Sequence, residues 1–124
     1  MRRSFVALLA LTGALACHSL LSPRNNLDGT WIQTGVDTYA ELVLVQQGMA
    51  VKGTFSYCSA LQGCTTHYKV SGTTVFPLVV LRWSESGHDV TFDATVNADT
   101  LAGRMALNGQ APGPTTAFHR STGP

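Results

Sequence analysis

Short runs of alternating apolar and polar residues fill the chain from residue 28 to residue 120. In the clearest run, 89–97, Val90 and Phe92 fall on one face, while Thr91 falls on the other. A period of two residues is that of a β-strand with one buried face. We find no helical periodicity in this part of the chain, so the pattern predicts an all-β domain.

Eight such runs follow one another, separated by Gly, Pro, Asn and Asp residues typical of turns. Pro77 cannot donate to a strand ladder, so it predicts a bulge or a break. Gly53 and Gly103 indicate places where the wall bends. The predicted strands span residues 29–34, 38–47, 51–58, 67–72, 75–83, 89–97, 100–109 and 115–120.

Most connections between these runs are short enough for hairpins of an up-and-down meander. Eight antiparallel strands joined in this way can close into a barrel, which removes the exposed edges of the sheet. The predicted fold is therefore a small antiparallel up-and-down eight-stranded β-barrel, spanning residues 28–120, after an N-terminal segment that is removed.

The first 16 residues predict that removable signal segment. Arg2 and Arg3 precede the apolar run 5–16. This run is too short to cross a bilayer as a helix, which takes about 20 residues, but it suits the h-region of a signal peptide. Ala14 and Ala16 form a small-x-small cleavage pattern.

The cysteine count favours lipid attachment at Cys17. The site resembles a bacterial lipobox, although Ala14 stands where Leu is usual. If Cys17 is acylated, Cys58 and Cys64 remain as an even pair. The alternative is ordinary secretion with a free thiol at Cys17. We therefore expect a lipoprotein of the cell envelope, with the bilayer as a partner through Cys17.

Residues 17–27 contain Pro23 and read as a tether, and residues 121–124 read as a polar tail. In the lipoproteins that this segment resembles, Asp after the Cys marks retention at the inner membrane. His18 stands there instead, which favours the outer membrane, facing the periplasm.

Charge excludes two classes of partner. Removal of Arg2 and Arg3 with the signal segment leaves six Lys and Arg against seven Asp and Glu, a net charge of −1. Nucleic-acid binding and polybasic membrane binding both need a strongly cationic face. Neither is expected here.

The sequence resembles the lipocalin-like, or calycin, group of barrels. The likeness rests on Gly29-Thr30-Trp31 at the start of the first strand, on the meander of eight strands, and on Arg120 at the end of the last. In that group the Arg packs across the Trp and hydrogen-bonds to backbone. The resemblance implies that Gly29, Trp31 and Arg120 plug one end of the barrel. Stacking of a guanidinium group on an indole is worth about 0.5–2 kcal/mol.

Cys58 and Cys64 are separated by five residues. In an exported protein this predicts a disulfide that closes the loop between the third and fourth strands, worth about 2–3 kcal/mol. A redox pair would more often be C-x-x-C. His67, His88 and His119 lack the spacing of a metal site, so we predict no metal and no cofactor.

No motif indicates catalysis. The chain has no G-x-S-x-G, no H-E-x-x-H and no glycine-rich loop that opens a helix. Asp89 and Asp93 share a strand face, but the alternation places that face outside. We therefore do not expect an enzyme.

A lipocalin-like barrel implies a ligand at its open end, opposite the Trp31 plug. The predicted function is passive binding of a small apolar or amphipathic molecule by the inner wall. The residues predicted to contact it are Leu44, Gln46, Phe55, Tyr57, Phe92 and Met105.

A filled interior is the alternative, since an eight-stranded barrel is just wide enough to be filled by its own side chains or to hold one small ligand. The barrel would then be an interaction or inhibitor module, whose loops 58–66, 84–88 and 109–114 contact an envelope protein. The runs 42–45 and 77–81 are apolar on both faces. Their outer faces are partly covered by a loop, are ordinary exposed Val, or form a patch that meets a partner protein or the membrane surface.

Overall fold

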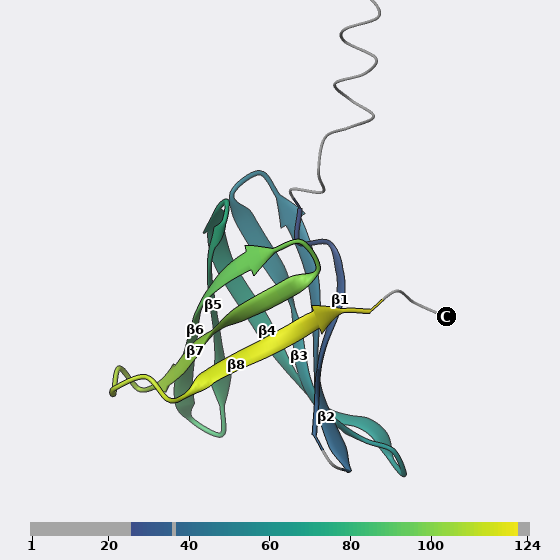
Figure 1. The fold of residues 1–124 in the computed structure, drawn as a ribbon. Coiled ribbons are helices and arrows are strands. Elements are labelled where there is room, and N and C mark those ends of the chain that lie inside the picture. Colours follow the sequence, from purple (N-terminus) through teal and green to yellow (C-terminus); the bar gives the residue numbers. More distant parts are fainter. Residues whose placement is uncertain (1–25, 36, 122–124) are drawn as a thin grey trace, which may run out of the picture.

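The computed structural model describes residues 26–35 and 37–121, which form a closed barrel of eight strands (Figure 1). Each strand pairs antiparallel with the next in chain order, and β8 returns to pair with β1. The predicted all-β up-and-down barrel is therefore confirmed. The strands are β1 Gly29–Thr34, β2 Thr38–Gln47, β3 Ala50–Ser59, β4 Gly63–Val75, β5 Leu78–Glu85, β6 His88–Asn97, β7 Thr100–Leu107 and β8 Thr115–Arg120.

The signal segment, Cys17 and most of the predicted tether lie outside the described residues. Within the part of the chain that the structure describes, no helix has the length and apolar character needed to cross a bilayer.

The longest strand, β4, differs most from its prediction. It runs from Gly63 to Val75 rather than over 67–72. Pro77 lies in the turn between β4 and β5, so the chain breaks there, and β5 begins only at Leu78. The predicted loop 58–66 is mostly a β-hairpin.

The Cys58–Cys64 disulfide explains that hairpin. The two residues lie opposite each other in the β3–β4 ladder and are joined by a bond of 1.99 Å. The bond holds the ends of β3 and β4 together, so the ladder extends over polar residues that show no apolar alternation. The predicted disulfide is confirmed.

Glycines allow the strand backbones to approach closely where the wall bends. A Cβ atom on Gly53 would stand 1.8 Å from the carbonyl oxygen of Val43. The same construction gives 2.0 Å to a neighbouring carbonyl oxygen at Gly72 and at Gly103. A side chain at any of these positions would overlap backbone, so the curvature of the barrel depends on them.

Apolar side chains from all eight strands meet in the interior. The rings of Phe55 and Trp83 stack with centroids 4.6 Å apart, and Phe118 meets Phe92 edge to face at 5.6 Å. Leu27, which the sequence assigns to the tether, is also buried in this core and therefore belongs to the barrel. The other core members are Trp31, Ala40, Leu42, Leu44, Val51, Val70, Val79, Leu81, Val90, Ala94, Val96 and Leu101.

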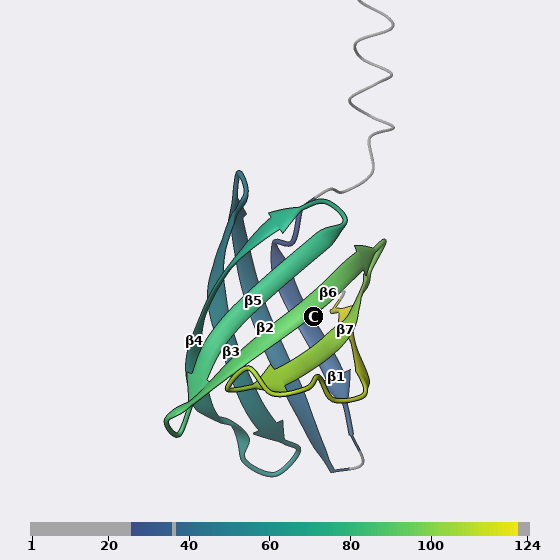
Figure 2. The same cartoon turned by 90° about the vertical axis from the view of Figure 1, so that its left-hand side faces the viewer.

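The barrel has two different ends. We call the end where β1 begins and β8 finishes the closed end, and it lies uppermost in Figure 2. The turns β2–β3, β4–β5 and β6–β7 are at this end. We call the opposite end, with the β1–β2, β3–β4 and β5–β6 turns, the open end.

Candidate ligand-binding site

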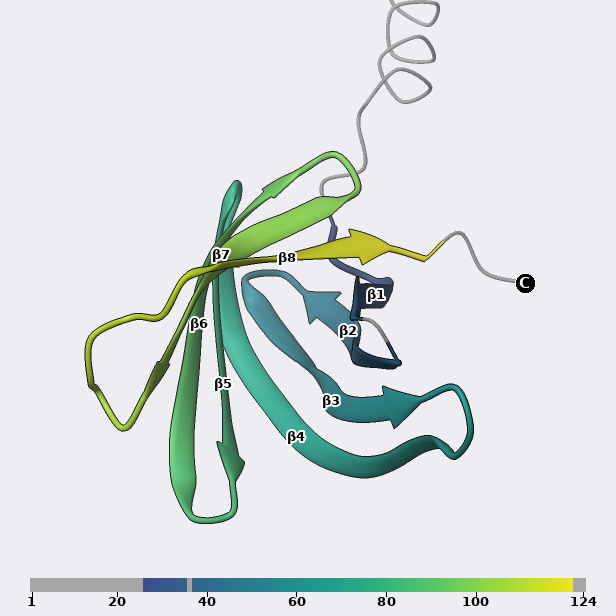
Figure 3. The ribbon, with the colours of Figure 1, turned by 60° about the horizontal axis from the view of Figure 1, so that its bottom comes forward.

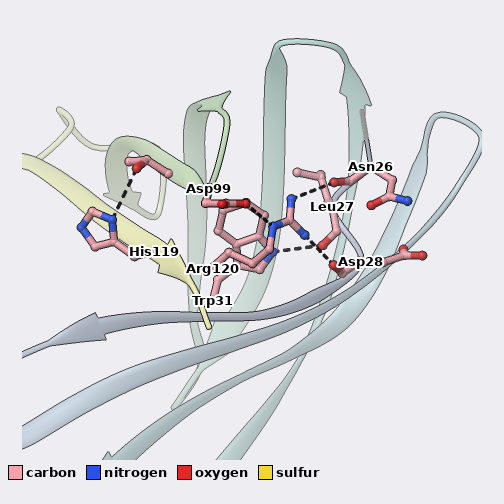
Figure 4. Close-up of polar contacts among 8 residues, drawn as sticks. Asn26, Leu27, Asp28, Trp31, Asp99, His119 and Arg120 are labelled. Carbon is pink, nitrogen blue, oxygen red and sulfur yellow. Dashed lines mark hydrogen bonds and ion pairs between the residues drawn. The ribbon is translucent and has the colours of Figure 1, made fainter. Parts of the chain in front are cut away.

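Trp31 fills the closed end. Its side chain is 0 % exposed, and its Nε1–H donates to the carbonyl oxygen of Leu27 at 3.0 Å. The guanidinium carbon of Arg120 lies 4.2 Å from the indole centroid (Figure 4). Gly29 has φ +128°, and a Cβ atom there would lie 3.6 Å from the Arg120 side chain. Gly29, Trp31 and Arg120 therefore lie together.

Arg120, the last residue of β8, also contacts the segment that precedes β1 and the turn between β6 and β7. It donates to the carbonyl oxygens of Asp28 at 2.6 Å and Asn26 at 3.0 Å, and to the Asp99 carboxylate at 3.0 Å. Since its guanidinium group is nearly buried and faces the indole, the two side chains together cover the core at this end.

Gln46 lies at the closed end, so its predicted place at the open end is wrong. Its side chain accepts from the backbone N–H of Leu27 at 3.0 Å and donates to the carbonyl oxygen of Gly48 at 2.8 Å. Because β2 runs toward the closed end, Leu44 is also in this half, opposite Gly29 in the ladder. The alternation predicted which face of the strand these two residues occupy, but not their position along the barrel axis.

A carboxylate that the sequence did not single out organises the open end. Glu85 accepts from the Tyr57 hydroxyl at 2.9 and 3.1 Å and from the indole N–H of Trp83 at 2.8 Å. The Tyr57 ring also meets Phe55 edge to face at 4.9 Å. Tyr57 is 47 % exposed, so it lies on the rim and not on the inner wall that we predicted.

Partial burial and the Glu85 hydrogen bond raise the pKa of Tyr57 to about 12, and the negative charge of Glu85 adds to the effect. A raised folded-state pKa means that the folded protein holds this proton more tightly than the unfolded chain. The contribution to stability is complete below pH 10, the ordinary value, and is lost as pH rises toward 12.

We therefore expect the Tyr57→Phe variant to lack the step near pH 12 in the phenolate absorbance titration. The difference in unfolding free energy between wild type and this variant should also shrink from pH 10 to 12, because the variant has no proton to lose. Glu85→Gln should shift the step to lower pH. A Tyr57 step that stays in place in Glu85→Gln would contradict the contact.

A groove opens where β4 and β5 part. The two strands pair only from Ser71 opposite Arg82 to Val75 opposite Leu78. Toward the open end β4 curves away from β5 (Figure 3). The groove has a volume of about 910 Å³. It is lined by His67, Tyr68, Lys69, Ser71, Arg82, Trp83, Ser84, Asp89, Val90, Thr91, Asn108 and Gly109.

The groove combines apolar and cationic groups. Trp83 and Val90 are core residues that reach its lining. Lys69 and Arg82 supply positive charge, and neither forms an ion pair within residues 26–35 and 37–121. Asp89 is the single carboxylate of the lining. Such a surface suits a molecule with an apolar body and an anionic group.

The predicted contact residues lie elsewhere. Leu44, Phe55 and Phe92 are buried in the core, and Met105 packs against them. Tyr57 lines a separate pocket of about 180 Å³ beside the β1–β2 turn. None of the six residues lines the groove. That any of them touches a ligand stays a prediction.

Among the described residues, one group of side chains brings together atoms of the kinds that can ligate a metal ion. Atoms of Glu41, Cys58 and Cys64 lie within 4.8 Å of one another, but the two sulfurs are joined in the disulfide. The three histidines among the described residues do not converge; each contacts a different side chain, in the pairs His67–Ser56, His88–Asn108 and His119–Thr100.

No family model and no curated protein matches the chain. One solved structure with a similar course of the chain is a mutant of the fluorescent protein UnaG. The TM-score is 0.48 and the sequence identity 12 %, over 78 % of this chain and 97 % of that one. The barrel described above rests on its own strand order.

Proposed function

We propose that this protein binds a small amphipathic anion in the β4–β5 groove. Ligand sites in proteins are concave, have volumes of about 300–1,000 Å³, and carry polar groups that orient the ligand. The groove has a volume in this range, about 910 Å³, with Trp83 and Val90 in its lining. This opening is the observation that supports the proposal.

Because aromatic side chains fill the interior, we place the proposed site beside the barrel axis and not on it. Phe55 stacks on Trp83, and Phe118 meets both Phe55 and Phe92 in the middle of the barrel. A ligand on the axis would have to displace these rings. In the groove, an apolar body can contact the partly buried ring of Tyr68 without opening the core.

The charges of the groove favour an anionic head group. Asp89 already accepts from the hydroxyl of Ser84 at 2.9 Å, whereas Lys69 and Arg82 have no ion-pair partner in the described part. A carboxylate, sulfonate or phosphate can accept charge-assisted hydrogen bonds from these cations, each worth about 1.5–3 kcal/mol.

We further propose that the protein is exported and anchored at the envelope by acylated Cys17. The Cys58–Cys64 disulfide is consistent with a compartment outside the cytoplasm, where such bonds persist. Mass spectrometry of the processed protein tests the anchor directly. A mature N-terminus other than an acylated Cys17 would refute it.

Titration of tryptophan fluorescence with dodecanoate tests the groove. We expect saturable quenching, and at least a tenfold weaker affinity for the Lys69→Gln/Arg82→Gln variant, because the head group loses both cations. Dodecyltrimethylammonium, with the same tail and opposite charge, should bind more weakly to wild type.

Lys52→Gln is the matched control, since it removes an exposed cation of β3 outside the groove. It should leave the dodecanoate affinity unchanged. Equal affinities in all three proteins, or no binding by a folded wild type, would refute the proposed site.

A filled-core interaction module is the second candidate, and the packed aromatic interior favours it. The barrel would then serve as a scaffold for loops at the open end. If neither amphipathic probe binds while the barrel stays folded, this candidate becomes the better explanation.

A further inference from the structure

Five exposed apolar side chains gather on two hairpins at the closed end. We call them the apolar tip. Met49 is 68 % exposed at the β2–β3 turn, and the others are also substantially exposed to solvent. The apolar tip consists of Val45, Met49, Val75, Phe76 and Leu78.

The two hairpins are neighbours, so the tip is one surface. The backbone N–H of Thr74 in β4 donates to the carbonyl oxygen of Met49 at 2.9 Å. Val75 lies opposite Leu78 in the β4–β5 ladder. Strands β2, β3, β4 and β5 follow one another around the barrel, which places Val45 at one edge and Leu78 at the other.

No carboxylate lies on the parts of these hairpins near the closed end. Residues 43–52 and 73–80 contain no Asp or Glu, and Lys52 is their one charged residue. Lys52 lies opposite Val45 in the β2–β3 ladder. A lysine can keep its ammonium group at the level of lipid phosphates while its stem lies on apolar surface. Burial of this surface in a membrane interface would therefore remove no anion from water.

The chain enters the barrel at the same end. Asn26 and Asp28 are held there by Arg120, and Cys17 precedes Asn26 by nine residues. Nine residues reach at most about 30 Å when fully extended. A lipid on Cys17 would thus keep the closed end, and not the groove end, within this distance of the bilayer surface.

We infer that the apolar tip docks on the bilayer surface, with Met49 and Phe76 inserted among the lipid head groups. The orientation leaves the open end of the barrel facing away from the membrane. The inference rests on the proposed anchor, which brings the closed end near the bilayer. Docking itself depends on the apolar surface of the tip and can be tested without the lipid.

The test uses the chain from His18 onward, which lacks the apolar run 5–16 and Cys17. It retains the whole barrel, whose strands and core lie within residues 27–120. Binding to vesicles of phosphatidylethanolamine and phosphatidylglycerol is measured by flotation. We expect measurable partition for this chain, and at least a tenfold lower partition coefficient for Met49→Ser/Phe76→Ser.

Leu61→Ser is the matched control. Leu61 is 98 % exposed, but at the β3–β4 turn of the open end. This variant should partition like the parent chain. Quenching of tryptophan fluorescence by brominated lipids tests which end of the barrel faces the bilayer. The fluorescence of a Phe76→Trp variant should be quenched more strongly than that of a Leu61→Trp variant. Thermal melts check that each variant is folded.

Three outcomes would overturn the inference. These are no partition of the parent chain, an equal loss in the Leu61→Ser control, and dimers that disappear in Met49→Ser/Phe76→Ser, which would show that a second copy covers the tip. The result is independent of the groove, because dodecanoate affinity is measured without vesicles. It is also independent of acylation, because the chain tested has no Cys17.

Discussion

Replacing Trp31 with Ala should lower the free energy of unfolding by about 3–5 kcal/mol, the range for deletion of a large buried aromatic side chain. Trp31 is completely buried, and its indole is the face on which the Arg120 guanidinium lies. The variant also leaves the Leu27 carbonyl without its indole donor and the nearly buried cation without its ring. The cavity and the loss of these two polar interactions therefore both lower the free energy of unfolding.

Urea unfolding of the variants measures the effect. Trp31→Phe should lose less than Trp31→Ala, because a ring still fills the end. Thr34→Ala, an exposed position at the other end of β1, should change the free energy of unfolding by no more than about 0.5 kcal/mol. A loss below about 1 kcal/mol for Trp31→Ala would show that the plug is not a main support of the barrel.

Replacing Gly53 with Ala should cost about 3 kcal/mol or more, at the upper end of the range for overpacking. The new Cβ atom would stand 1.8 Å from the carbonyl oxygen of Val43. This obstacle is backbone and not a flexible side-chain end, so two strands must move apart to relieve it. Their separation would weaken the β2–β3 ladder on both sides of the substitution.

Gly113→Ala provides the comparison. A Cβ atom there would lie 3.6 Å from the carbonyl oxygen of Met105, an ordinary contact. Thermal melts should therefore show a large fall in midpoint for Gly53→Ala and little change for Gly113→Ala. Equal behaviour of the two variants would mean that the wall can relax around Gly53 and that its curvature does not depend on this glycine.

The sequence predicted the barrel well because each strand has one face in a filled interior. The period of two residues thus survives in β2 and β6, whose bounds agree with the prediction to within one residue. In β4 exposure still alternates, but polar residues such as Thr65 and Thr73 extend the strand, so no apolar pattern marks its bounds. There the disulfide and the neighbouring strands, not apolar alternation, hold the ladder.

The candidate site was harder to predict, because it depends on register. The alternation assigns a residue to a face, but it does not say which residues lie level with it on other strands. Gln46 therefore appeared suitable for a ligand, although it caps Leu27 at the closed end. Glu85 gave no signal, since Tyr57 comes from a distant strand and no motif marks the hydrogen bond with Trp83, two residues earlier in β5. The groove needs β4 and β5 to part, which no local pattern encodes.

The contacts of Arg120 with Asn26 and Asp28 bring the two ends of the described chain side by side. Ser121 adds a backbone hydrogen bond to Thr30 at 2.7 Å. In space the strands form a cycle in which each pairs through backbone hydrogen bonds only with its two neighbours, so the strand that comes first along the chain has no special place in the sheet. A circular permutant that joins the old ends and begins at Gly63 would keep all eight strand pairings and the disulfide.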